Sequence, residues 1–161
     1  MTKSWLALLF VPTLAAAAPK SASRLDNLAG SWKGTGSLLA GKDKAPLTFE
    51  WSCKKTAAAS GMLCTLDIKG MPAPYAETDL FGYEPNTDTL HWFSVTNAGD
   101  THDHVAKPGD GKLQFVFKGS QDGKPLVETI DFDLGKELTI RAETKVGDQV
   151  QSVLEAKGKK A

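Results

Sequence analysis

Most of the chain alternates between apolar and polar residues over short segments that end at Gly, Pro, Asn or Asp. Alternation at every second position is the pattern of a β-strand with one buried face. Helical periodicity is nearly absent after Gly30, although residues 21–28 have the polar start and the glycine stop of a short helical turn. The pattern predicts strands at approximately 32–39, 47–56, 62–70, 75–83, 89–97, 101–107, 112–118, 125–134, 137–146 and 149–157.

The connections between these segments are short, as at Ala98-Gly99, 108–111 and Gln121-Asp122-Gly123. Links of this length join antiparallel neighbours, so the strands should form a meander. A meander with one apolar face leaves two exposed edges unless it closes on itself. The sequence therefore predicts an all-β fold, an antiparallel meander of about ten strands closed into a barrel. A two-sheet sandwich is the competing architecture, but it normally requires longer crossing connections.

The first residues form a segment of their own. Lys3 precedes an apolar stretch at 5–14, and small residues follow at 15–18. This order is typical of an export signal, and about ten apolar residues are half of the roughly 20 needed to cross a bilayer. We expect cleavage near Ala17 and a mature protein in the periplasm or outside the cell. The expected organisation is a signal peptide at 1–17, a linker with a short helix at 18–29, the barrel at 30–158 and a disordered basic tail at 159–161.

The charges are balanced and scattered. The chain has 19 Lys and Arg and 19 Asp and Glu, which gives a formal net charge of zero. A nucleic-acid or anionic-membrane partner therefore has no electrostatic support, and no membrane insertion is expected. The oligomeric state stays open.

The two cysteines flank one predicted turn. A two-residue loop would set Cys53 directly opposite Cys64, at a Cβ separation of roughly 4.5–5.5 Å that small adjustments bring to disulfide distance. The same register sets Trp51 opposite Leu66, so the apolar pattern and the cysteines agree. An exported protein meets oxidising conditions, and we expect a structural disulfide. The alternatives are a reduced pair or half of a metal site.

A glycine-rich run opens the first predicted strand. In Gly30-Ser31-Trp32-Lys33-Gly34-Thr35-Gly36, glycines permit a tight bend and Trp32 is expected to plug one end of the barrel. Gly30-Ser31-Trp32 resembles the first signature of the lipocalins and the wider calycin group. The run from Gly30 to Gly36 is also similar to the opening of nitrobindin-type ten-stranded barrels, which bind haem through a His near the last strands. This chain has no His after His104, so haem is not expected.

A wider resemblance covers most of the chain after the leader. Leu28-Ala29-Gly30-Ser31-Trp32, Gly82-Tyr83-Glu84-Pro85 and the basic Lys157 resemble motifs of a family of uncharacterised bacterial exported lipocalin-like proteins. The resemblance implies a lipocalin-like barrel. It assigns no role, because the family itself has none.

The three histidines fall on two neighbouring predicted strands. His102 and His104 are two residues apart and share one face. A two-residue turn at Ala98-Gly99 would set Phe93 opposite His104 and His91 opposite Ala106. We therefore expect all three imidazoles to point into the barrel together with Phe93.

The next two strands add aromatic rings and a carboxylate. Phe115 and Phe117 lie on the apolar face of their strand, and a four-residue turn at 108–111 would place His104 opposite Phe115. Glu128 interrupts an otherwise apolar series on the following strand, opposite Phe115. An apolar interior with a few polar groups is the usual composition of a small-molecule site.

These residues support one main hypothesis and two alternatives. The main hypothesis is a non-enzymatic protein that binds a small, largely apolar molecule, with His104 and Glu128 as polar anchor. The expected walls are Trp51, Leu66, Phe93, Phe115 and Phe117. One alternative is a zinc-like site at His91, His102 and His104 with hydrolase or lyase chemistry. The other is a structural envelope domain whose polar cluster binds nothing.

Two further carboxylates share a face with Phe81 and Tyr83. They are Glu77 and Asp79, and an exterior, solvated position is favoured for them. The sequence contains no Gly-x-Ser-x-Gly elbow, P-loop or dinucleotide fingerprint. No catalytic residue is assigned.

Overall fold

The computed structural model describes residues 25–56, 61–106 and 112–161. A 3-10 turn, η1 (Asp26–Leu28), precedes ten strands. They are β1 (Gly30–Ala40), β2 (Asp43–Lys55), β3 (Gly61–Lys69), β4 (Tyr75–Glu84), β5 (Thr89–Thr96), β6 (Thr101–Ala106), β7 (Leu113–Gln121), β8 (Lys124–Leu134), β9 (Leu138–Val146) and β10 (Gln149–Lys160). The predicted signal peptide and the first half of the predicted helical turn (21–24) lie outside the described residues, and η1 lies in the second half. No helix in the described part is long and apolar enough to cross a membrane.

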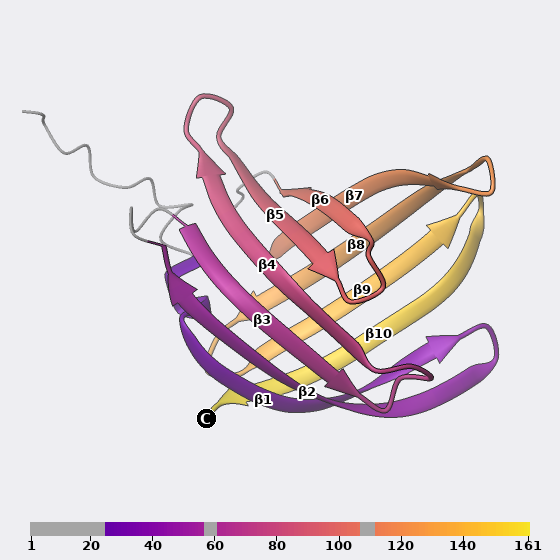
Figure 1. Cartoon of the computed structure of the whole chain (residues 1–161), viewed down its shortest axis with the longest axis horizontal. Helices are drawn as coiled ribbons and strands as arrows, with labels where there is room; N and C mark the ends of the chain where they lie inside the picture. The colour runs from indigo at the N-terminus through magenta and orange to yellow at the C-terminus, as the bar shows by residue number, and fades with distance from the viewer. Residues whose placement is uncertain (1–24, 57–60, 107–111) are drawn as a thin grey trace, which may run out of the picture.

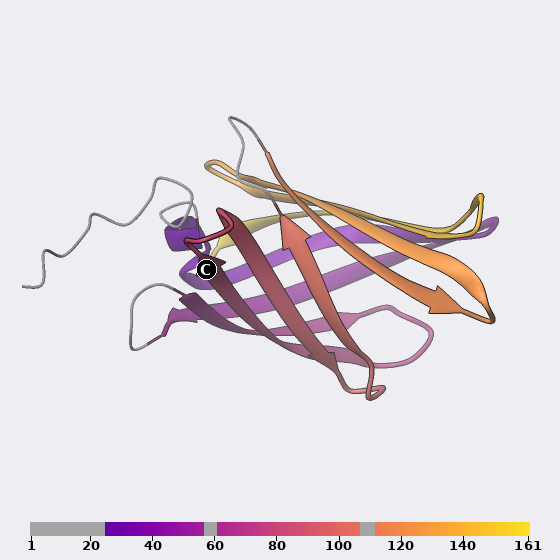
Figure 2. The ribbon, with the colours of Figure 1, turned by 90° about the horizontal axis from the view of Figure 1, so that it is seen from above.

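Every strand pairs antiparallel with the next one along the chain, and β1 also pairs with β10. The sheet is therefore a closed barrel, which confirms the meander that the alternating pattern predicts (Figure 1). Figure 2 shows η1 and the C-terminus at one end of the barrel. The β1–β2, β7–β8 and β9–β10 turns lie at the opposite end, which we call the turn end.

The β2–β3 hairpin has the predicted register. Cys53 lies opposite Cys64 and Trp51 lies opposite Leu66. The two cysteines form a disulfide, as predicted. Both Trp51 and Cys64 are almost fully buried, so this hairpin presents its apolar face to the barrel interior.

Trp32 is buried at the end of the barrel near η1. Only 2% of its surface is exposed, and its indole Nε1 donates a hydrogen bond of 2.9 Å to the carbonyl oxygen of Leu28. The ammonium of Lys160 lies 5.2 Å from the centre of the indole ring. Leu28 is also buried, so η1 covers the Trp32 side chain.

The sequence predicts a disordered basic tail at 159–161, but the structure has these residues ordered beside β1. β10 continues to Lys160, where Lys159 pairs with Lys33 and Lys160 pairs with Trp32. The reason is that closure of the barrel gives these residues a partner strand along the whole of β1. The barrel accordingly extends two residues beyond the predicted boundary at 158.

The β5–β6 connection is longer than predicted. The backbone N–H of Thr96 donates to the carbonyl of Asp100, and the Thr96 hydroxyl accepts hydrogen bonds from the N–H groups of Ala98 and Asp100. This wider turn pairs Trp92, not Phe93, with His104. A slip of one residue turns every side chain of a strand to its other face.

Two predicted interior residues are therefore on the outer surface. Phe93 is 43% exposed and does not form an interior wall. His91 stacks on Phe93, and its Nδ1 lies 3.1 Å from the Oδ1 atom of Asp103. His91 is thus separated from the other two histidines. The inward positions of β5 belong to Trp92 and Ser94, which are both buried.

Five aromatic rings form the centre of the core. Their closest pairs have ring centroids between 5.2 and 6.4 Å apart, in stacked, tilted and edge-to-face arrangements. The rings are those of Trp51, Phe81, Trp92, Phe115 and Phe132. This aromatic cluster fills the middle of the barrel.

Candidate functional site

The barrel contains a cavity of about 200 Å³ whose lining is mainly apolar. Its aromatic floor consists of Trp51, Trp92 and Phe132, which are at most 5% exposed. Lining residues nearer the turn end, such as Leu38 and Leu154, are partly exposed. The cavity thus runs from the aromatic cluster toward solvent at the turn end.

Two of the predicted walls line this cavity, and three do not. Trp51 and Leu66 are lining residues. Phe115 is fully buried in the aromatic cluster. Phe117 is not a lining residue and stacks on His102. Phe93 is on the outer surface. Residues that the sequence did not assign, including Phe49, Ile68, Met71, Ile130, Phe132 and Ile140, supply the rest of the apolar wall.

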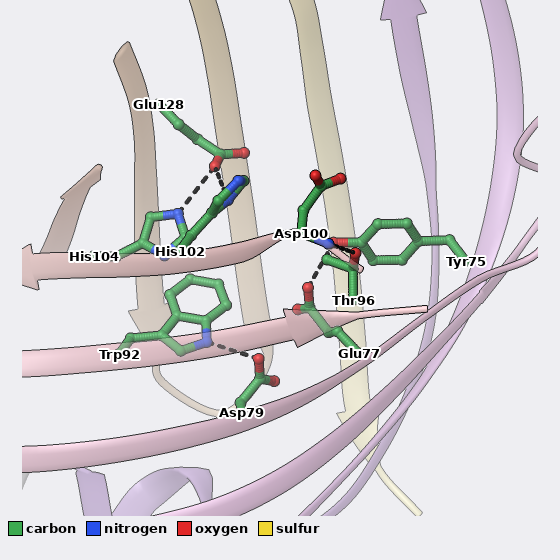
Figure 3. Close-up of polar contacts among 9 residues, drawn as sticks. All are labelled: Tyr75, Glu77, Asp79, Trp92, Thr96, Asp100, His102, His104 and Glu128. Atoms are coloured by element: carbon green, nitrogen blue, oxygen red, sulfur yellow. Dashed lines mark hydrogen bonds and ion pairs between the residues drawn. The ribbon is translucent and has the colours of Figure 1, made fainter. Parts of the chain in front are cut away.

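A cluster of two histidines and one carboxylate lies on one side of the cavity (Figure 3). His102 and His104 come from β6 and Glu128 comes from β8, so the contacts cross over β7. The Oε2 atom of Glu128 lies 2.9 Å from His104 Nε2 and 3.4 Å from His102 Nδ1. We call these three residues the histidine–glutamate cluster. It includes the predicted polar anchor, His104 and Glu128.

The electrostatics of the histidine–glutamate cluster favour an ionised carboxylate. Burial raises the pKa of Glu128, but the hydrogen bond from His104 and the charges of both histidines outweigh it, so the pKa is lowered. Glu128 is therefore negatively charged at neutral pH. Its pairing also differs from the prediction, since Glu128 lies opposite Phe117 and not opposite Phe115.

Aromatic stacking holds both imidazole rings. His102 stacks on Phe117 with ring centroids 4.2 Å apart, and His104 stacks on Trp92 at 4.7 Å. His104 is 2% exposed, and its Nδ1 atom has no hydrogen-bond partner among the described residues. The orientation of each ring is thus set by packing as well as by Glu128.

A second polar group lies on β4, and the sequence placed it wrongly. Glu77 is 8% exposed and Asp79 is fully buried, so both carboxylates point inward. The Asp79 carboxylate accepts hydrogen bonds from the indoles of Trp51 (3.0 Å) and Trp92 (2.7 Å). The hydroxyl of Tyr75 donates to Glu77 at 2.5 Å. Asp79 thereby fixes two of the three rings that form the cavity floor.

Burial changes the protonation of these carboxylates. Burial and the neighbouring Asp79 charge raise the pKa of Glu77 to about 8, although the Tyr75 hydrogen bond opposes the shift. Burial raises the pKa of Asp79 to about 6, against the hydrogen bonds from both indoles. Burial and the nearby Glu77 also raise the pKa of Tyr75 well above its ordinary value. At neutral pH Glu77 is therefore mostly protonated, Asp79 mostly ionised and Tyr75 neutral.

The position of these carboxylates follows from the pairing of β4 with β3, which the sequence alone does not fix. Cys64 is directly opposite Asp79, so an inward disulfide implies an inward Asp79. The register that connects them is set by the irregular segment at 70–74, whose length alone does not fix the pairing.

The comparisons with known proteins place the chain by its fold. No family model and no curated protein matches it. Its structure is similar to the crystal structure of Rv2717c from M. tuberculosis, with a TM-score of 0.66 and 17% identity over 89% of this chain and 98% of that chain. It is also similar to the S-type phycobiliprotein lyase CPES from Guillardia theta, with a TM-score of 0.58 and 11% identity over 86% and 91% of the two chains.

At these identities the likeness shows the fold alone. The chain is a ten-stranded closed β-barrel with a mostly apolar interior cavity and buried polar groups on one side. That class of structure is the starting point for the function.

Proposed function

We propose that this protein is an exported, non-enzymatic binding protein that holds a small, largely apolar molecule inside its barrel. The observation that carries the proposal is the cavity of about 200 Å³, which combines an aromatic floor with a polar cluster on one side. Small-molecule sites commonly have this composition, with apolar walls for affinity and a few polar groups for orientation.

The apolar part of the molecule would lie against Trp51, Phe132 and Leu66. Burying roughly 300 Å² of apolar ligand surface at about 25 cal/mol per Å² is worth about 7 kcal/mol before the cost of association. The polar end would meet His102 and Glu128, which are partly exposed on the cavity side.

The charges in the cavity limit the chemistry of the bound molecule. Glu77, Asp79 and Glu128 all lie in or beside it, and both oxygens of Asp79 already accept indole hydrogen bonds. An anionic ligand would be repelled by Glu128 and Asp79. We therefore favour a neutral molecule with an N–H or O–H group that donates a hydrogen bond to the Glu128 carboxylate.

Other features support the proposal without testing it. The fold that this chain shares with a phycobiliprotein lyase is compatible with handling a small molecule. The apolar leader favours export, and the Cys53–Cys64 disulfide is what an oxidising compartment would produce.

The decisive experiment is a titration with the neutral fluorescent probe N-phenyl-1-naphthylamine. Leu66 lines the cavity, whereas Leu80 on β4 is 45% exposed on the outer surface. We expect Leu66→Trp to fill the cavity and abolish the fluorescence increase. The matched variant Leu80→Trp adds the same indole outside and should bind the probe like the unmodified protein. Failure of the unmodified protein to bind, or equal binding by both variants, would contradict the proposal and favour a structural domain without a site.

A further inference from the structure

The histidine–glutamate cluster has the donor set of a transition-metal site. Two imidazoles and one carboxylate suit Zn²⁺ and similar ions, whereas Mg²⁺ and Ca²⁺ prefer oxygen ligands alone. His102 and His104 are two residues apart on one strand and face Glu128 across β7. The sequence had assigned His91 as a third ligand, and the structure puts Glu128 in that position.

The separations are close to those of a tetrahedral metal. One potential ligand atom from each side chain can be chosen so that all three lie within 4.8 Å of one another. The Glu128 oxygen is already 2.9 Å from His104 Nε2 and 3.4 Å from His102 Nδ1. Bonds of about 2.1 Å at tetrahedral angles place ligand atoms roughly 3.4 Å apart. Within the set of ligand atoms that lie within 4.8 Å of one another, no separation exceeds the tetrahedral value by more than about 1.4 Å.

The rings that would bind the metal are held in place before it arrives. Phe117 stacks on His102, and Trp92 stacks on His104. Trp92 is itself fixed by its hydrogen bond of 2.7 Å to Asp79. Preorganised ligands lose little side-chain freedom when the ion binds.

The cluster also leaves room for a fourth ligand. His102, His104 and Glu128 all line the cavity. A site with three protein ligands and one open position is the arrangement in which zinc accepts water or a donor atom from a bound molecule. The open position of this cluster would face the cavity.

We propose that His102, His104 and Glu128 bind one Zn²⁺-like ion whose free coordination position faces the cavity. This goes beyond the binding of an apolar molecule, because the ion requires none of the apolar walls. The ion displaces the contacts that Glu128 makes with the two imidazoles and replaces them with three metal–ligand bonds.

The test is a calorimetric titration of Zn²⁺ into the untagged, chelator-treated protein, repeated with Co²⁺ to record its visible absorption. We expect one equivalent of Zn²⁺ and a tetrahedral Co²⁺ spectrum. His102→Ala and Glu128→Gln should each weaken Zn²⁺ binding by at least about tenfold, because each removes a ligand. Both residues are partly exposed, and circular dichroism would show that the variants fold.

His91→Ala is the matched control. His91 lies near carboxylates of Asp103 and Glu84 on the outer surface, so it would be the competing place for an adventitious ion. Retention of binding in His91→Ala supports the proposal. Equal loss in His91→Ala, or unchanged binding in His102→Ala, would overturn it, as would absence of Zn²⁺ binding by the unmodified protein.

The same samples separate this inference from the proposed function. Binding of N-phenyl-1-naphthylamine by metal-free protein that takes up no Zn²⁺ would refute the metal site and leave the apolar cavity. Zn²⁺ binding without probe binding would support the metal site and contradict the proposed binding of an apolar molecule.

Discussion

Replacement of Glu77 by Gln should change how the stability of the protein depends on pH. Glu77 is a carboxyl group whose pKa rises from 4.5 to about 8 in the folded state, because it is buried beside Asp79. The folded state thus holds this proton more tightly than the unfolded chain. The stabilisation is complete below pH 4.5 and is lost as the pH rises to about 8. A Gln side chain resembles the protonated form and cannot lose a proton.

The size of the effect follows from the pKa values. Asp79 has a folded-state pKa of about 6, so above pH 6 Glu77 contributes most of the carboxylate-linked loss. Each pH unit is worth about 1.4 kcal/mol well below the pKa, and less near pH 8 where Glu77 is half ionised, so the change between pH 6 and pH 8 is roughly 2 kcal/mol. For a chain of this size that is a difference of roughly 5–10 °C in melting temperature.

The assay is thermal unfolding followed by circular dichroism at closely spaced pH values from 6 to 8. We expect the melting temperature of the unmodified protein to fall more steeply than that of Glu77→Gln, by roughly 5–10 °C over the range. Every ionisable group except Glu77 is present in both proteins, so the difference between the two curves reports Glu77 together with its effect on the neighbouring Asp79. Glu50→Gln, on the exposed face of β2, is the control and should follow the unmodified protein. Parallel curves for Glu77→Gln and the unmodified protein would refute the reasoning about the buried carboxylate.

Three further predictions concern the barrel and its export. Replacing both Cys53 and Cys64 by Ser removes a disulfide between residues 11 positions apart, and it should lower the free energy of unfolding by about 3 kcal/mol. Urea denaturation measures this change, and an unchanged free energy of unfolding would contradict a stabilising role for the disulfide. Gly34→Ala should destabilise by at least about 2 kcal/mol because its Cβ would overlap the backbone of β10, while Gly82→Ala, with open space around it, should stay within about 1 kcal/mol; similar losses would refute the packing argument. Protein expressed with its leader and recovered from the periplasm should begin at Ala18 by mass spectrometry, and a retained leader would contradict the export prediction.

The sequence predicts best where two independent signals agree. In the β2–β3 hairpin, the cysteines and the apolar residues specify the same register, and the structure has Cys53 opposite Cys64 and Trp51 opposite Leu66. Closure of the meander also follows from pattern alone, because short connections leave few other topologies.

The sequence predicts poorly where a single turn decides the register. The Ala98-Gly99 dipeptide suggests a tight turn, but the hydroxyl and N–H of Thr96 hydrogen bond within a wider one. Because of this slip, the inward-facing positions of β5 are occupied by Trp92 and Ser94 and not by His91 and Phe93. Glu77 was missed for a related reason, since burial of a carboxylate depends on tertiary partners that no local pattern reveals.

The most direct test of the central proposal is a crystal structure of the protein with N-phenyl-1-naphthylamine bound. We expect the probe inside the barrel, in contact with Trp51, Phe132 and Leu66, at the cavity that runs toward the turn end. The outer face of β4 and β5 is the alternative location, because Leu80 and Phe93 are 45% and 43% exposed there. A probe found on that face with an empty interior would contradict the account.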